Sequence, residues 1–140
     1  MYKDVLLAID LGEEHSWKKA LPKAIEARGD SGNLHVMTVL PEFGMSVISQ
    51  YFPEHFEEDT LEATKKALRA FIDKNVPKDI PCRAIVTQGR VYEQVLRMSE
   101  EIGCDLIVMA AGNPSLARYL LGPNAARVVR HANCCVLVVR

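Results

Sequence analysis

The chain has 140 residues, of which 17 are Lys or Arg and 18 are Asp or Glu, giving a formal net charge of -1. This length predicts one domain over residues 1–140, and the balanced charge argues against nucleic acid and anionic membranes as partners. The apolar run Val5–Ile9 is too short for a signal peptide or a membrane span, so we expect a cytoplasmic protein. Four cysteines lack the spacing of a zinc or thioredoxin-like site, so we expect free thiols and no metal.

Five apolar runs rich in Val, Ile and Leu predict the strands of the fold. In chain order they are Val5–Ile9, Leu34–Leu40, Ala84–Val86, Leu106–Met109 and Val136–Val139. Several of these runs are unbroken rather than alternating, which is typical of strands that are buried on both faces of a parallel sheet.

Apolar residues at three- and four-residue steps predict four helices between and after these runs. The expected buried faces are Trp17, Leu21, Ala24 and Ile25; Leu61, Leu68, Phe71 and Ile72; Val91, Val95, Met98 and Ile102; and Ala125, Val128, Val129 and Ala132. Pro22 should kink the first helix or delay its start, and Gly103 should end the third. The alternation predicts an α/β fold with a parallel sheet, right-handed crossovers and helices on both faces.

The segment from Pro41 to Glu58 is apolar but shows no clear period, although it holds Phe43, Phe52 and Phe56. An apolar connection of this length is often a lid or a contact surface. The alternative is that some of its side chains only cover the end of the core. The sequence leaves both interpretations open.

Open parallel sheets bind ligands outside the carboxyl ends of their strands, where the strand order reverses. This rule places the candidate site among the segments that follow Ile9, Leu40 and Met109. Asp10 ends the first strand, and its carboxylate can accept hydrogen bonds from a ribose hydroxyl or an adenine amino group. Asp is also a common turn former, so Asp10 has an equally good explanation as a residue that only organises the turn.

Gly112 and Gly122 punctuate the loop after the fourth predicted strand, just before a helix. A helix N-terminus offers unpaired N–H groups and partial positive charge to a phosphate; ordinary capping is the alternative. Pro123 suits the first helical position but has no N–H group, and the side-chain amide of Asn124 can replace part of that loss. The P-loop and G-x-G-x-x-G patterns are absent.

Cys134 and Cys135 are neighbours in a predicted strand, so their side chains should point to opposite faces. A disulfide between them would be strained, and we expect buried thiols. The four histidines share no spacing with a Cys or Ser nucleophile, so the sequence indicates no acyl-transfer site.

Five stretches carry a family resemblance: YKDVLLAID, LHVMTVL, VTQGRVYEQVL, CDLIVMAAG and, most specifically, YLLGPNAARVVRHANCCVLVVR. Together they resemble the universal stress protein family over essentially the whole chain. The resemblance implies a Rossmann-like, open α/β fold with a five-stranded parallel sheet in the order 3-2-1-4-5 between four helices. It also implies a homodimer formed through the C-terminal strand, Cys135–Arg140. One branch of the family binds ATP, and another branch binds none.

The ATP-binding branch resembles Gly-x2-Gly-x9-Gly-(Ser/Thr) after the fourth strand, and this chain departs from that pattern. Aligned on Gly122, the spacing to Gly112 is kept and Met109 stands at the first glycine. Aligned on the strand, Ala110 replaces the first glycine, Asn113 replaces the second, and the loop is one residue short. We prefer the strand alignment because the family often has Met-Gly where this chain has Met109 and Ala110.

Pro123 stands where that pattern has a hydroxyl residue, so a phosphate would lose one N–H and one O–H donor. Each such hydrogen bond contributes about 1.5–3 kcal/mol, which predicts weaker binding or a preference for nucleotides with fewer phosphates. The resemblance implies adenine and ribose recognition at Ala8, Ile9, Asp10 and Val39. Backbone groups of Ala8 and Val39 would meet the base, and Asp10 would meet the sugar.

The resemblance therefore implies a stress-response regulatory module that binds ATP, ADP or AMP, with or without Mg²⁺, and acts on an unknown protein partner. It is not expected to be an efficient enzyme, because the phosphate loop offers no base to activate water; slow ATP hydrolysis stays open. One alternative is a nucleotide-free protein of the same fold that acts through its Phe43–Phe56 segment. A second is an enzyme, such as a nucleotide hydrolase or an adenylating protein.

Overall fold

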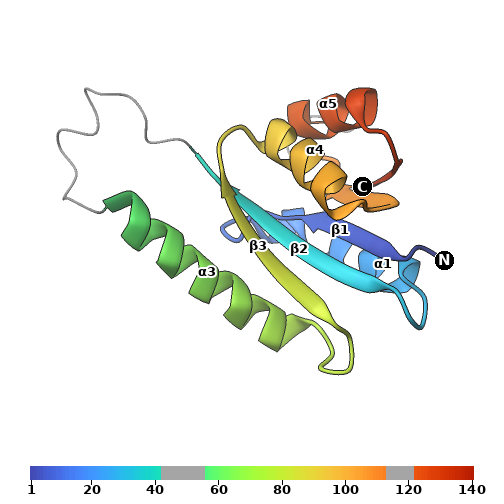
Figure 1. The fold of residues 1–140 in the computed structure, drawn as a ribbon, viewed down its shortest axis with the longest axis horizontal. Coiled ribbons are helices and arrows are strands. Elements are labelled where there is room, and N and C mark those ends of the chain that lie inside the picture. Colours follow the sequence, from blue (N-terminus) through green and yellow to red (C-terminus); the bar gives the residue numbers. More distant parts are fainter. Residues whose placement is uncertain (42–55, 113–121) are drawn as a thin grey trace.

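The fold alternates strands and helices along the chain, as the apolar pattern predicts. The computed structural model describes residues 1–41, 56–112 and 122–140. Its elements are β1 (Asp4–Ala8), the 3-10 turn η1 (Glu14–Ser16), α1 (Ala20–Ala27), β2 (Asn33–Leu40), α3 (Phe56–Asn75), β3 (Cys82–Gln88), α4 (Val91–Ile102), β4 (Leu106–Ala110), α5 (Pro123–His131) and β5 (Cys135–Val139). The strands form one parallel sheet in the order β3-β2-β1-β4-β5, which confirms the predicted fold and strand order (Figure 1).

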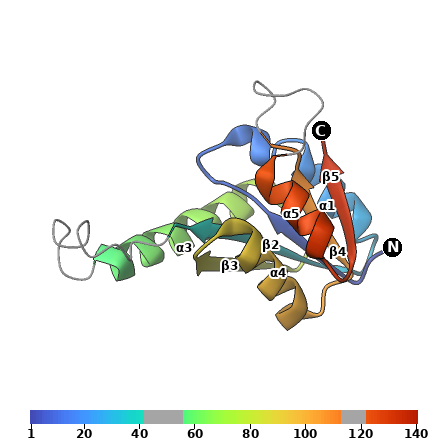
Figure 2. The same cartoon turned by 90° about the horizontal axis from the view of Figure 1, so that it is seen from above.

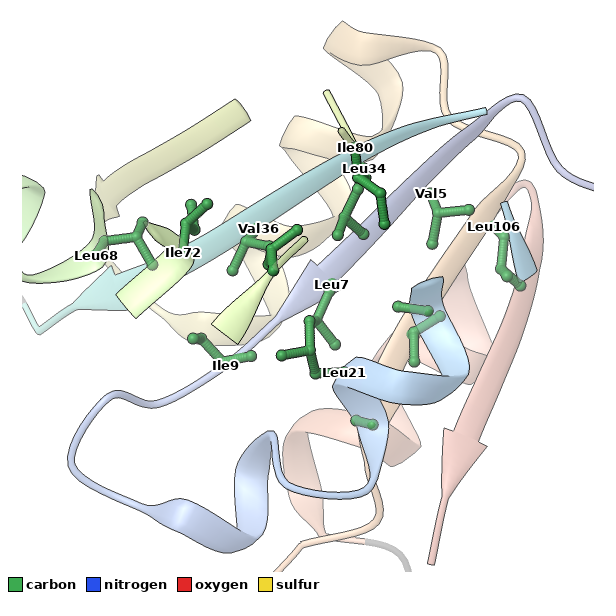
Figure 3. Close-up of a cluster of buried hydrophobic side chains, with 14 residues drawn as sticks. Val5, Leu7, Ile9, Leu21, Leu34, Val36, Leu68, Ile72, Ile80 and Leu106 are labelled. Carbon is green, nitrogen blue, oxygen red and sulfur yellow. The ribbon is translucent and has the colours of Figure 1, made fainter. Parts of the chain in front are cut away.

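The sheet separates two apolar cores because successive side chains of a strand point to opposite faces. Val5 and Leu7 of β1 pack against α1 and α3, whereas Leu6 and Ala8 pack against α4 and α5. In the first core, Leu21 of α1 and Leu68 of α3 converge on the strands (Figure 3). Figure 2 shows α3 and β5 on opposite sides of the molecule.

The helix ends agree with the sequence signals in two places and differ in a third. α1 begins at Ala20, so Pro22 falls in its first turn, where a missing N–H group is tolerated. Gly103 ends α4 with a left-handed φ of 71°, as predicted. Trp17 does not belong to α1: its N–H group bonds to the Glu14 carbonyl in the turn before the helix, and its ring packs edge-on against Phe71 at 4.9 Å.

Two burial predictions near the C-terminus are wrong. Val129 is 47% exposed, since α5 turns Ala125 and Val128 toward the sheet and leaves Val129 outside that face. Cys135 is exposed rather than buried. It begins β5, an edge strand that pairs only with β4 and is therefore covered on one side.

The segment predicted as a lid or a contact surface, Pro41–Glu58, lies largely outside the described residues, and only its last three residues belong to α3. Among the helices that the structure describes, none is long and apolar enough to cross a membrane.

Candidate functional site

A pocket of about 690 Å³ opens at the carboxyl ends of β1 and β2. Its walls come from three elements: the turn after β1, the end of β2 and the first half of α3. The lining residues are Asp10, Leu11, Gly12, Thr38, Val39, Leu40, Pro41, Asp59, Thr60, Ala63, Thr64 and Ala67. The predicted position lay among the segments that follow Ile9, Leu40 and Met109. The described lining includes residues after Ile9 and at the end of β2, but none after Met109.

The end of β2 directs a backbone donor and a backbone acceptor toward the space beyond β1. The Met37 carbonyl accepts the Ile9 N–H group at 2.9 Å, whereas the Leu40 carbonyl accepts the Gly89 N–H group from the opposite side at 2.8 Å. Peptide groups alternate sides along a strand, so the N–H and C=O groups of Val39 point toward β1, as those of Met37 do. β1 has its last paired residue opposite Met37, and Val39 therefore faces the space past its end.

Asp10 organises the turn after β1 and also lines the pocket. Its Oδ1 accepts the Gly12 N–H group at 3.0 Å, and its own N–H group donates to Ser16 Oγ at 2.8 Å. The turn-forming role that the sequence allowed is thus present. A carboxylate has about four acceptor positions, so one bond to Gly12 leaves Asp10 able to accept hydrogen bonds from a ligand.

The two glycines of the loop after β4 lie against each other. Gly112 has a φ of +115°, and a Cβ atom built on it would lie 2.9 Å from both the N and Cα atoms of Gly122. The Gly122 N–H group donates to the Ala111 carbonyl, and the Ala111 N–H group donates to Val139 at 2.9 Å. This backbone contact brings the start of α5 to the carboxyl end of β4.

The first turn of α5 has few amides left for a ligand. Gly122 is the N-cap and Pro123 is the first helical residue, as predicted. The first amide bonded within the helix is that of Ala126, which donates to the Gly122 carbonyl at 3.0 Å. Because Pro123 has no N–H group, only the amides of Asn124 and Ala125 remain in this turn without an acceptor inside the helix.

The other predicted site residues occupy several positions in the fold. Ala8 and Ile9 are buried at the end of β1. Met109 is buried in the core beneath α4 and α5, and Ala110 ends β4, where an extended backbone suits alanine as well as glycine. Asn113 lies outside the described residues.

The α3 wall of the pocket did not emerge from the sequence. Thr60 and Thr64 are four residues apart, as are Ala63 and Ala67, so these small side chains fall on one helical face. That spacing was the available signal, but it does not reveal that this face meets β2. Asp10 and Asp59 are the only charged residues in the described lining.

The sequence as a whole matches one protein family: the model described as the universal stress protein family covers residues 1–140. The chain belongs to the universal stress protein family. It is 32% identical to universal stress protein G of Escherichia coli O157:H7 over 142 residues, which cover all of both chains. It is also 31% identical to universal stress protein G of Salmonella typhimurium, again over the full length of both.

Solved universal stress proteins share the fold. A family protein from Burkholderia pseudomallei is 26% identical, with a TM-score of 0.71 over 99% of this chain and 96% of that one. A universal stress protein in complex with cAMP is 22% identical, with a TM-score of 0.61 over 99% of this chain and 97% of that one. At this identity the second comparison shows the fold alone.

The described part of this universal stress protein contains no group of three or more His, Cys, Asp or Glu residues arranged to hold a metal ion. A Mg²⁺ ion that entered the pocket together with a nucleotide would depend on the phosphates for most of its ligands, which is how proteins usually hold this ion.

Proposed function

We propose that this universal stress protein is a regulatory module that binds an adenine nucleotide at the carboxyl ends of β1, β2 and β4. The observation that carries the proposal is the backbone edge of Val39, which faces the space beyond β1 beside Asp10. Adenine carries an acceptor, N1, next to a donor, the N6 amino group. The N–H group of Val39 can donate to N1, and its C=O group can accept from N6. Guanine presents the opposite pattern on this edge and would be rejected.

The charges around the pocket favour one orientation of the nucleotide. Asp10 and Asp59 give the described lining a negative charge, which repels phosphates but can accept hydrogen bonds from ribose hydroxyls. The N-terminus of α5 offers the opposite polarity at the carboxyl end of β4, because helix N-termini carry partial positive charge. The base and sugar would therefore lie toward α3, and the phosphates toward Gly122.

Two amides in the first turn of α5, those of Asn124 and Ala125, have no acceptor inside the helix and would meet the phosphates. We expect Pro123 to weaken ATP binding more than AMP binding, since the third phosphate gains most from additional donors. A structural neighbour is a universal stress protein in complex with cAMP, which supports an adenine nucleotide as the ligand.

The proposal extends to the assembly and its setting. The edge strand β5 leaves Leu137 38% exposed, and an unpaired apolar edge invites pairing with another strand. We propose a cytoplasmic homodimer joined through Cys135–Arg140, acting in the stress response on a protein partner. Asp10 and Asp59 are the only charged residues in the described lining of the pocket, and we propose that they bind the ribose, so that the protein acts by binding and signalling rather than by rapid hydrolysis.

The test is isothermal titration of ATP and AMP, each with Mg²⁺, into the wild type and a Pro123→Ser variant. The serine restores one amide and one hydroxyl, so ATP affinity should rise by about tenfold or more, with a smaller gain for AMP. Pro77→Ser is the matched control, because Pro77 is exposed between α3 and β3, away from the site. Asp10→Ala should lower the affinity for both nucleotides.

The proposal is overturned if neither the wild type nor the Pro123→Ser variant binds ATP or AMP. It would favour a nucleotide-free protein that acts through protein contacts. Multiple turnovers of ATP that disappear in Asp10→Ala would instead indicate an enzyme.

A further inference from the structure

Three of the four cysteines gather at the amino ends of β4 and β5, the end of the sheet opposite the proposed nucleotide site. Cys104 lies two residues before β4, Cys134 directly precedes β5, and Cys135 is the first residue of β5. The register places Leu106 opposite Cys135 in neighbouring parallel strands. The chain segments that carry Cys104 and Cys134 therefore lie side by side.

Cys104 and Cys134 lie close together. Both pack in the core beneath α4 and α5, and each thiol shifts the pKa of the other. Continued by one residue, the register places Cys134 opposite Asp105, so Cys104 is offset from Cys134 by one position. A strand spacing of about 4.8 Å with this offset gives a Cα separation of about 6 Å, within the range of about 4.4–6.8 Å that a disulfide spans. A bond between the two sulfurs thus needs only a local adjustment of side chains.

The two thiols differ in access to solvent and in electrostatic surroundings. Cys104 is only 7% exposed, and burial raises its pKa to about 12. Cys134 is half-buried, and burial raises its pKa as well, although the Cys104 thiol beside it acts in the opposite direction. Cys134 is thus the more accessible thiol of the pair, and its neighbour offsets part of the effect of burial on its pKa.

We propose that Cys104 and Cys134 form an oxidisable pair, in which a hydroperoxide reacts at Cys134 and Cys104 then closes a disulfide. The Cys134 thiolate attacks one oxygen of the peroxide, giving a sulfenic acid, and the other oxygen leaves as hydroxide. The Cys104 sulfur attacks the sulfenic sulfur, the S–S bond forms, and a second hydroxide leaves. The two thiol protons convert both hydroxides to water, or to one water and one alcohol for an organic hydroperoxide, so that two thiols are oxidised and one peroxide is reduced.

The other two cysteines serve as internal controls. Cys82 lies in β3, at the opposite edge of the sheet from β5, and burial raises its pKa to about 11. It matches the pair in chemistry but has no nearby thiol among the described cysteines, so it should stay reduced. Cys135 is exposed, and its thiol interacts with Tyr2.

The experiment treats the reduced full-length protein with hydrogen peroxide, blocks the remaining thiols by alkylation and maps the tryptic peptides by mass spectrometry. A Cys135→Ser background leaves one cysteine in the peptide His131–Arg140. We expect this peptide to be joined to Met98–Arg118 with the loss of two hydrogens, while Asp79–Arg83, which contains Cys82, is alkylated. The rate should rise about tenfold per pH unit between pH 7 and pH 8.5, because the thiolate is the nucleophile.

Single substitutions test the order of the steps. Cys104→Ala should let a sulfenic or sulfinic acid accumulate at Cys134, whereas Cys134→Ala should leave Cys104 reduced. The proposal is overturned if peroxide links chains only through Cys135 in the otherwise unchanged protein, or if Cys104 is alkylated fully after Cys134 has been oxidised. The mapping of the parent protein decides the question even if a cysteine variant fails to fold.

Discussion

At the scale of single residues, Gly112 is a position where the backbone conformation and a close backbone contact both require glycine. Its φ of +115° is rarely adopted by residues with a side chain, and a Cβ atom there would meet the backbone of Gly122 rather than a movable side chain. The sequence suggested Gly112 as a phosphate-loop glycine. Its contact with Gly122 could not be predicted, because it depends on how the chain returns from the loop.

Gly112→Ala should therefore lower the free energy of unfolding by about 3 kcal/mol, through both backbone strain and the clash. Gly103→Ala is the control: Gly103 also has a positive φ, 71°, but a Cβ atom added to it would have no neighbouring atom within 4 Å, so the cost should be near 1 kcal/mol. Urea denaturation of both variants measures the difference. Equal losses would mean that the contact with Gly122 adds nothing.

Asp105 is a second residue whose role is local and electrostatic. Its carboxylate accepts the N–H groups of Lys3 and Asp4, each at 2.9 Å, and so ties the start of β1 to the start of β4. Burial alone would raise the pKa of Asp105, but these backbone hydrogen bonds outweigh it and lower the pKa below the usual 3.8. The ionised form therefore stabilises the fold.

Asp105→Ala should cost about 1–3 kcal/mol of stability at pH 7, since both amides lose a charged acceptor. A carboxyl with a lowered folded-state pKa stabilises above its unfolded pKa, and this contribution is lost as the pH falls through the folded value. The difference in free energy of unfolding between wild type and variant should thus be constant near neutral pH and should shrink below pH 3.8. Thermal unfolding from about pH 7 to about pH 2.5 measures it, with exposed Asp79→Ala as the control; a gap independent of pH would contradict this role.

At the scale of elements, β5 differs from the interior strands because it has one neighbour among the described strands and a half-exposed surface. Its apolar run predicted a strand correctly, but not the exposure of Cys135 and Leu137. β3, at the other edge, is longer than its predicted core Ala84–Val86, because polar residues such as Arg83 and Thr87 extend an edge strand without extending the apolar run. The interior strands β1, β2 and β4 were predicted within one residue at each end. These strands are buried on both faces, so nearly all of their residues are apolar and the apolar run marks the whole strand.

Leu137→Arg should convert the proposed homodimer to a monomer, because it places a charge in the strand that would pair across the interface. Val129→Arg is the matched control, an exposed apolar residue on α5 rather than on β5. Light scattering at micromolar protein concentration gives the molecular mass of each variant. A monomeric wild type, or a Leu137→Arg variant that stays dimeric, would contradict pairing through β5.

At the scale of the whole molecule, one sheet supports two cores, and the candidate site lies where the sheet ends. The sequence predicted that Asp10 lies at this end, because open parallel sheets bind ligands outside the carboxyl ends of their strands, whereas Val39 was implied only by the family resemblance. It did not reveal the α3 wall with Asp59, Thr60 and Thr64. The position of that wall depends on the path of α3 across β2 and β3, which follows from packing and not from local periodicity.

The two cores should unfold together, since every strand contributes to the same sheet. Leu68→Ala, beneath α3, should cost about 2–5 kcal/mol, and Val95→Ala, beneath α4, about 2 kcal/mol; both residues are fully buried. The double variant should lose the sum within about 0.5 kcal/mol, because the sheet separates the sites. Fluorescence of the single tryptophan, Trp17, and far-UV circular dichroism should report one midpoint; separate midpoints would indicate independent units.

The contact between Gly112 and Gly122 has a consequence for how the chain tolerates change in length. Since the backbone closes at the base of this connection, β4 and α5 are positioned by residues outside it. The entropy of closing a loop grows only slowly with its length, by about 0.6 kcal/mol for each doubling. We therefore expect a change in the number of residues between the two glycines to leave the sheet in place, and a peptide tag inserted there to change the free energy of unfolding only slightly.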